Sequence, residues 1–304
     1  MWLRCPRAVW GKALIFLTVK EVARFTVLSR GTLDLRAFWH SLEVRGPVWT
    51  RRQLFEPGAV RRLSSLVSVP ADWLLQFGNL TALELQSSAV DPSLHPAVST
   101  LTNLLQLTLV YNHPRLEPEF WESLGACLAN LPRLEYVRLS GVEASRDMSW
   151  LPSTLLGLDL DDCGLQDLIH VPPMLRLLAL DLSKNAMLQD EDVRALVRAA
   201  PRLCSVNLNG CKWLSSEGFD SLQNLKPTLQ HLEVADTLIE EASLLKLLPL
   251  PKLNVHGTRN LSASAVRRIL HQVRSGSFGC HDKDTDLEFY KAVVHGDDYD
   301  SDSD

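Results

Sequence analysis

A motif of spaced leucines recurs along most of the chain and constrains its fold more than any other feature. Residues 175–188 read LRLLALDLSKNAML and contain the spacing L-x-x-L-x-L-x-x-N-x-x-L. The second apolar residue of each L-x-L core falls at Leu85, Leu109, Leu139, Leu160, Leu182, Leu208, Val234 and Val255. The steps between these positions are 24, 30, 21, 22, 26, 26 and 21 residues. One unit of this length cannot bury its apolar face alone, so successive units must stack and share a core.

Self-similarity at this period, with this spacing, is typical of leucine-rich repeats. We therefore expect an α/β fold, a leucine-rich-repeat solenoid of about eight to nine repeats with a parallel concave sheet. In each repeat strand the leucines point inward, and the residues between them face the concave side. A small N-terminal helical module, described below, precedes the repeats.

The residue three positions after each L-x-L core is usually small and able to form hydrogen bonds. These residues are Ser88, Asn112, Val142, Cys163, Asn185, Cys211, Thr237 and Thr258. Where a strand leaves the sheet, buried backbone groups lose their partners and need a side-chain substitute. We call this position the turn slot. Val142 cannot act as such a substitute, so an irregular coil is expected there.

Four segments follow from these patterns. Residues 1–45 form the N-terminal module, and 46–78 form a linker with a degenerate capping repeat. Residues 79–275 carry the repeats and a C-terminal capping helix, and 276–304 form an acidic disordered tail.

Helical apolar spacing predicts connecting helices within residues 117–134, 189–203 and 215–225. Ser262 or Ser264 is expected to cap the final amphipathic helix, which should run to Val273.

The middle outward residue of each strand defines the expected binding face for a client protein. These residues are Glu84, Arg138, Asp159, Asp181, Asn207, Glu233 and Asn254, with Thr108 in the second repeat. The face is more acidic than basic, which favours a basic client segment, although a merely solvated sheet face also fits. It does not suit nucleic acid, because phosphates require Lys and Arg on the binding surface.

The chain lacks the motifs of enzyme or metal sites. It has no glycine-rich phosphate loop, no G-x-S-x-G and no His, Cys or Asp spacing suited to a metal. We expect no enzyme activity, no cofactor and no metal. The six cysteines form no C-x-x-C pair and no run is long enough for a membrane span, which favours a cytoplasmic or nuclear location.

The N-terminal residues show helical spacing in three short segments. The first is PRAVWGKALIFL from Pro6, the second KEVARFTVLSR, and the third DLRAFWHSLEV, which contributes Leu35, Phe38, Trp39 and Leu42. About forty residues make no robust core alone, so this module should need a partner or the adjoining repeats.

This module resembles an F-box in its proline-to-leucine spacing, its following helix and its closing W-x-x-L. Repeats such as SVNLNGCKWLSSEGF are similar to those of F-box/leucine-rich-repeat proteins. The resemblance implies a substrate-recognition subunit of a cullin-type ubiquitin ligase, in which the F-box binds a Skp-type adaptor and the repeats bind a client. The implied adaptor-binding residues are Pro6, Val9, Trp10, Leu14, Leu17, Val22 and Leu28.

Two alternatives remain open at the level of sequence. The helical module can instead cap the repeats without meeting an adaptor, which makes the chain a leucine-rich-repeat scaffold or organelle assembly factor without a ubiquitin link. The first twenty residues contain Arg4, Arg7 and Lys12 but no acid, as in mitochondrial targeting segments.

In the tail, Ser301 and Ser303 lie among aspartates and are candidates for phosphorylation by acidophilic kinases.

Overall fold

The structure is a computed structural model that describes residues 41–44, 58, 60–66, 69–86, 92–111, 118–258, 260–262, 265, 268–269 and 272–275. The chain divides into two compact units. The first comprises residues 1–111 with 130–133, and the second comprises 112–129 with 134–304. Each unit consists of parallel strands joined by helices or irregular segments, so the predicted α/β class with parallel strands is confirmed.

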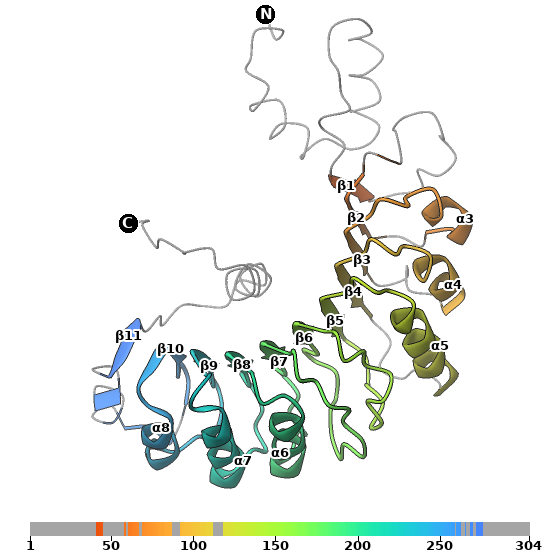
Figure 1. The fold of residues 1–304 in the computed structure, drawn as a ribbon. Helices are drawn as coiled ribbons and strands as arrows, with labels where there is room; N and C mark the ends of the chain where they lie inside the picture. Colours follow the sequence, from red (N-terminus) through yellow and green to blue (C-terminus); the bar gives the residue numbers. More distant parts are fainter. Residues whose placement is uncertain are drawn as a thin grey trace, which may run out of the picture. The chain divides into compact units, whose positions relative to one another are not determined.

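Among its described residues, the first unit contains four parallel strands. They are β1 (Ser41–Val44), β2 (Arg62–Ser65), β3 (Ala82–Gln86) and β4 (Gln106–Val110). The short helices α3 (Ala71–Leu74), η5 (Pro92–Leu94) and α4 (His95–Val98) connect them, and Figure 1 shows α3 and α4 beside the strands. Leu63, Leu83 and Leu107 occupy one register position and are each 1% exposed. The outward residues between them are less buried, as period-two alternation requires.

Strand β1 differs from the prediction for the third N-terminal segment. Residues 34–44 have helical spacing, but Ser41–Val44 form a strand parallel to β2, with Leu42 in register with Leu63. The edge of β2 carries backbone groups that need hydrogen-bond partners. Residues 41–44 satisfy them by forming a strand beside β2, and local helical spacing carries no information about this edge.

The second unit contains seven parallel strands among its described residues. They are β5 (Tyr136–Ser140), β6 (Gly157–Asp159), β7 (Ala179–Asp181), β8 (Ser205–Asn207), β9 (His231–Glu233), β10 (Leu250–Asn254) and β11 (Val273–Ser275). Helices α6 (Asp190–Ala199), α7 (Ser216–Ser221) with η6 (Leu222–Leu225), and α8 (Glu241–Leu247) lie in a row behind the strands β7–β10 (Figure 1). Helix α5 (Pro118–Ala129) also belongs to this unit.

The repeat positions read from the sequence lie side by side in this sheet. Leu158, Leu180, Val206, Leu232 and Leu253 pair in register from β6 to β10, and none is more than 3% exposed. Each fully buried side chain of this kind stabilises the fold by about 1.5–3 kcal/mol. The spacing of the leucines therefore predicts both the strand positions and their register.

The three predicted connecting helices are confirmed as α5, α6 and α7 with η6. Helix α6 shows why the prediction succeeds: Val193, Leu196 and Val197 are buried on one face, and three acidic residues occupy the first turn. Helix α8 was not predicted, since the 21-residue step that contains it leaves room for only two turns. No helix joins β5 to β6 or β6 to β7, and Val142 lies buried in the first of these irregular connections, as expected.

The C-terminal capping helix is shorter than predicted. Ser262 accepts a hydrogen bond from the Ala265 backbone N–H at 3.1 Å, so it caps the segment as one of the two candidate serines. Ala265 and Ile269 are helical and buried, but Val273 begins β11 and pairs with Leu250 of β10. Helical spacing assigns Val273 to the helix, but this residue instead forms a strand that pairs with the edge of β10.

Candidate functional site

The predicted client-binding residues of the second unit lie in one row across the sheet. From β5 to β10 the row is Arg138, Asp159, Asp181, Asn207, Glu233 and Asn254, paired in register on neighbouring strands. We call this set the central polar row. Glu84, the predicted member in the first unit, pairs with Thr108 on β4. The sequence pattern thus correctly predicts that these residues lie next to one another on adjacent strands.

Four members of the row use their short side chains to turn the backbone out of the strand. The Oδ1 atom of Asp159 accepts the N–H of Asp161 at 3.0 Å, and the same two-residue contact follows Asp181, Asn207 and Asn254 at 2.8, 3.0 and 3.0 Å. Such local bonds replace lost ladder partners at a turn. In the coil of Glu233, the Ala235 N–H donates to Asn209 Oδ1 at 2.6 Å.

The next turn residue has a left-handed backbone in each coil of the second unit from β5 to β10. Its φ angle lies between 53° and 73° at Gly141, Asp162, Lys184, Gly210, Asp236 and Gly257. Glycine and aspartate tolerate this region, and Lys184 is the exception. Sequence reasoning missed this position, although five of its six residues are Gly or Asp two places after the L-x-L core.

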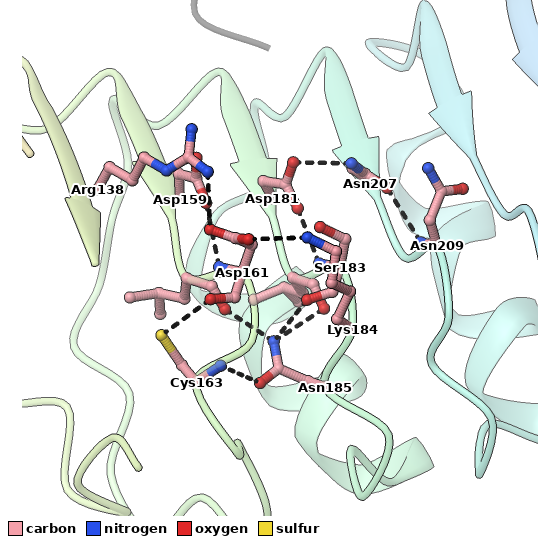
Figure 2. A network of polar contacts seen from close by, with 12 residues as sticks. Arg138, Asp159, Asp161, Cys163, Asp181, Ser183, Lys184, Asn185, Asn207 and Asn209 are labelled. Atoms are coloured by element: carbon pink, nitrogen blue, oxygen red, sulfur yellow. Dashed lines mark hydrogen bonds and ion pairs between the residues drawn. The ribbon is translucent and has the colours of Figure 1, made fainter. Parts of the chain in front are cut away.

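Arg138 joins two carboxylates that are almost completely buried. Its Nε lies 3.2 Å from Asp159 Oδ2, and its Nη2 donates to Asp161 Oδ1 at 3.0 Å (Figure 2). Asp159 is 2% exposed and Asp161 is 4% exposed. The Tyr136 hydroxyl donates to Asp159 Oδ2 at 3.1 Å, and Lys184 Nζ donates to Asp161 Oδ2 at 3.1 Å. Both carboxylates therefore have donors within the fold.

The two carboxyl groups ionise with different ease. Burial, reinforced by the like charge of Asp181, raises the pKa of Asp159 well above its ordinary value, and Arg138 offsets this only in part. Burial also opposes ionisation of Asp161, but Arg138, Ser140 and Lys184 outweigh it and lower its pKa. The pKa of Arg138 is raised, since Asp159 and Asp161 together outweigh its burial. Asp161 is thus the more firmly ionised partner of Arg138.

The turn slot performs the role that its residue types predict. Asn185 Nδ2 donates to the carbonyls of Leu160 and Leu182 at 2.8 and 2.9 Å, and its Oδ1 accepts from the N–H groups of Cys163 and Leu165, both at 3.0 Å (Figure 2). The other slot donors reach the carbonyl oxygens of nearby strand ends. They are Cys163 Sγ to Leu139, Cys211 Sγ to Leu182, Thr237 Oγ1 to Val234 and Thr258 Oγ1 to Val255.

The slot cysteines are poor nucleophiles in this setting. Burial raises the pKa of Cys211 to about 12, and burial with the charges of Asp161 and Asp159 raises that of Cys163. A thiol is reactive as its thiolate, so these groups act as small buried donors.

The central polar row is less open than the sequence suggests. Asp159, Asn207 and Asn254 are buried, whereas an outward strand position predicts exposure. Asn207 Nδ2 donates to Asp181 Oδ2 at 2.7 Å, and Glu233 accepts from Asn209 at 2.7 Å. Tyr136 and Arg138 reach from the adjacent strand to Asp159, a contact that strand alternation alone does not reveal.

Several predicted sites fall outside the described residues. They are the adaptor-binding set Pro6, Val9, Trp10, Leu14, Leu17, Val22 and Leu28, and the tail serines Ser301 and Ser303. Within the described ranges, no three or more His, Cys, Asp or Glu side chains are grouped to hold a metal ion. None of the helices in the described part of the chain is long and apolar enough to cross a membrane.

Comparison with known proteins places the chain in no family. No family model matches the sequence, and no curated protein matches it. Among solved structures, the chain is similar to one described as the crystal structure of the Rad7 and Elc1 complex in yeast, at 14% identity and a TM-score of 0.30. That match covers 84% of this chain and 88% of the other. Similarity at this level supports no inference about function.

Proposed function

We propose that this chain is a leucine-rich-repeat solenoid and acts as a non-catalytic protein-interaction module. The observation that supports this most directly is the in-register stack of strands β6–β10, in which equivalent residues share burial and equivalent turn slots bind the backbone. Such stacks offer extended surfaces for partner chains. Within the central polar row, Arg138 pairs with Asp159 and Asn207 donates to Asp181, which supports a structural role for these groups.

Within this class, the chain acts as the substrate-recognition subunit of a cullin-type ubiquitin ligase. The support is the F-box resemblance of residues 6–42 next to a repeat array. The module binds a Skp-type adaptor through the apolar stripe that includes Trp10, Leu14 and Leu17, and the repeats hold the client.

The test is direct binding of a purified Skp-type adaptor to the full-length chain. We expect a stable complex that the double substitution Trp10→Ala with Leu14→Ala abolishes, since large apolar anchors carry most interface energy. Ile169→Ser, which removes an apolar side chain that is 78% exposed in the second unit, serves as the control and should leave binding unchanged. Lack of adaptor binding by the unaltered chain would refute the ubiquitin link without refuting the interaction module.

The client is expected to be a basic segment that meets the row at Asp181 and Glu233. Both residues are half-buried, whereas Asp159 is buried. Replacing Asp181 and Glu233 with lysine should reduce recovery of bound client in affinity purification from cells. The control is Glu217→Lys together with Glu240→Lys, which makes the same charge change at exposed positions off the row. Equal client recovery from the two double variants would remove the row from the binding site.

A scaffold or organelle assembly factor without a ubiquitin link is the second candidate. It is favoured by the cationic, acid-free first twenty residues, which resemble a mitochondrial targeting segment. Sequencing the N-terminus of the protein isolated from cells separates the two candidates. An intact N-terminus fits the receptor, whereas a start after about residue 20 fits import and removes most of the adaptor-binding residues.

A further inference from the structure

Three neighbouring coils of the second unit expose a large apolar side chain in the turn, five residues after the L-x-L core in the first two coils and four residues after it in the third. Met187, Trp213 and Leu238 are 38%, 59% and 44% exposed, and each directly precedes a residue that is at most 1% exposed. We call these three residues the turn stripe. Tryptophan is on average among the most buried residues, and an aligned exposed set marks an interaction site more than single exposed residues do.

The turns that carry the stripe are held side by side. The Lys184 N–H donates to the Asn209 carbonyl at 2.7 Å, and the Gly210 N–H donates to the Ala235 carbonyl at 2.8 Å. Equivalent residues of paired strands lie about 4.8 Å apart, so the stripe extends about 10 Å over its two steps. This length suits a short extended segment of about three to four residues.

The exposed charges beside the stripe change sign along it. Lys184 and Lys212 lie in the turns of the first two coils, whereas Asp236 and Glu240 flank Leu238 in the third. Lys184 also contacts buried Asp161, yet its side chain stays 55% exposed. A fitting segment therefore has apolar side chains, acids at one end and a cation at the other.

Acids also lie on the helix side of the first two coils, where a single arginine offsets only part of their charge. Asp190 accepts hydrogen bonds from the N–H and hydroxyl of Ser215, and Glu191 and Glu217 both pair with Arg194.

We propose that the turn stripe docks residues 286–291 of this chain's own C-terminal tail. These residues read DLEFYK, which places Leu287 and Phe289 on one side of an extended segment, with Asp286 and Glu288 before Lys291. The acids then face Lys184 and Lys212, and Lys291 lies toward Asp236 and Glu240. This docking is independent of any ubiquitin link.

The connecting chain is long enough for this docking. Strand β11 ends at Ser275, and eleven residue steps separate it from Asp286. Eleven extended residues span at most about 36–40 Å. Four strand spacings, from β11 back to β7, amount to about 19 Å. The remaining length covers the path from the sheet to the turns.

Hydrogen–deuterium exchange of the full-length chain tests the proposal. Backbone amides of residues 287–290 should exchange about tenfold more slowly than unprotected amides, and Trp213→Ser should remove most of this protection. The matched control is Leu175→Ser, another apolar residue that is 60% exposed but precedes its strand. It should leave the tail protection unchanged. Unprotected amides in the unaltered chain, or equal loss in both variants, would overturn the proposal.

A charge exchange checks the orientation of the tail. Lys212→Glu and Glu288→Lys should each weaken the protection, and the two combined should restore it. Failure of the combined variant to recover protection would contradict the proposed direction. Protection that increases with protein concentration would show capture by a second copy, which would overturn docking within one chain.

Discussion

At the scale of single residues, the short polar side chains of the second unit act mainly on the backbone. Asp181, Asn207 and Asn254 each accept an N–H two residues later, and Asn185 binds donors and acceptors of two coils. Their polarity therefore does not measure how strongly the surface attracts a partner. A charge reversal at buried Asp159 would disturb folding before it reported on binding.

We predict that Asn185→Ala lowers the free energy of unfolding by about 3–5 kcal/mol, because it leaves several buried backbone groups without partners. Equilibrium urea unfolding measures this change. Asn260→Ala is the matched control, since it removes one exposed bond to the Leu238 carbonyl and should cost less than about 1 kcal/mol. Equal losses in the two variants would show that the turn slot contributes nothing special.

The two buried carboxylates predict opposite pH profiles. The folded pKa of Asp159 is raised, so the unaltered protein loses stability as pH rises from about 4 through that pKa, and Asp159→Asn should remove this loss. The folded pKa of Asp161 is lowered, so its contribution is present above about pH 4 and lost as pH falls. Asp161→Asn should therefore cost most near neutral pH.

Urea unfolding at a series of pH values between about 3 and 8 measures both profiles. Parallel profiles for the two variants would contradict the assignment of Asp161 as the more firmly ionised partner. Each asparagine keeps a side-chain acceptor, so any lost hydrogen bonding changes little with pH.

At the scale of elements, helix α6 shows how one side chain can join two coils. Asp192 is 3% exposed; its Oδ2 accepts the N–H of Gln189 at the helix start, and its Oδ1 accepts the N–H of Leu168 at 2.7 Å. The first contact is a capping interaction that the local sequence predicts. The second links the helix to the irregular connection of the preceding coil.

We predict that Asp192→Ala destabilises the protein by about 2–4 kcal/mol, because it removes a helix cap and leaves the half-buried N–H of Leu168 unpaired. Hydrogen exchange should accelerate both in α6 and at Leu168. Glu191→Ala, at an exposed neighbouring position whose side chain pairs with Arg194, should leave exchange at Leu168 unchanged. Acceleration confined to α6 would show that the link between the coils carries no energy.

At the scale of the whole molecule, backbone pairing within the second unit continues past the strand ends. The N–H of Leu160 donates to the Asp181 carbonyl at 2.9 Å, and that of Leu182 donates to the Asn207 carbonyl at 2.9 Å. Each coil therefore depends on its neighbours for buried leucine contacts and for backbone partners, as in other stacked repeats.

We predict that Leu182→Ala costs about 2–5 kcal/mol, and that hydrogen exchange in β6 and β8 accelerates nearly as much as in β7. The substitution leaves a cavity in the core, and the neighbouring coils share that core. Leu175→Ala, at a position 60% exposed, should change stability by less than about 0.5 kcal/mol. Faster exchange in β7 alone would mean that the coils unfold independently.

The sequence by itself determined the leucine positions, their register and the turn slots. These features repeat locally. The spacing of the leucines within each unit is constant, so stacking the units places equivalent leucines next to one another. The helices within 117–134, 189–203 and 215–225 follow from their own apolar periodicity. The F-box interpretation rests on residues outside the described structure and stays a prediction.

Only the tertiary structure decided which polar residues are available to a partner. Whether Asp159 is open or buried depends on how Tyr136 and Arg138 reach across from the adjacent strand. The strand assignment of residues 41–44 and the early end of the final helix likewise depend on neighbouring sheet edges. Local spacing carries no record of such contacts, because their energy comes from groups that are distant in sequence.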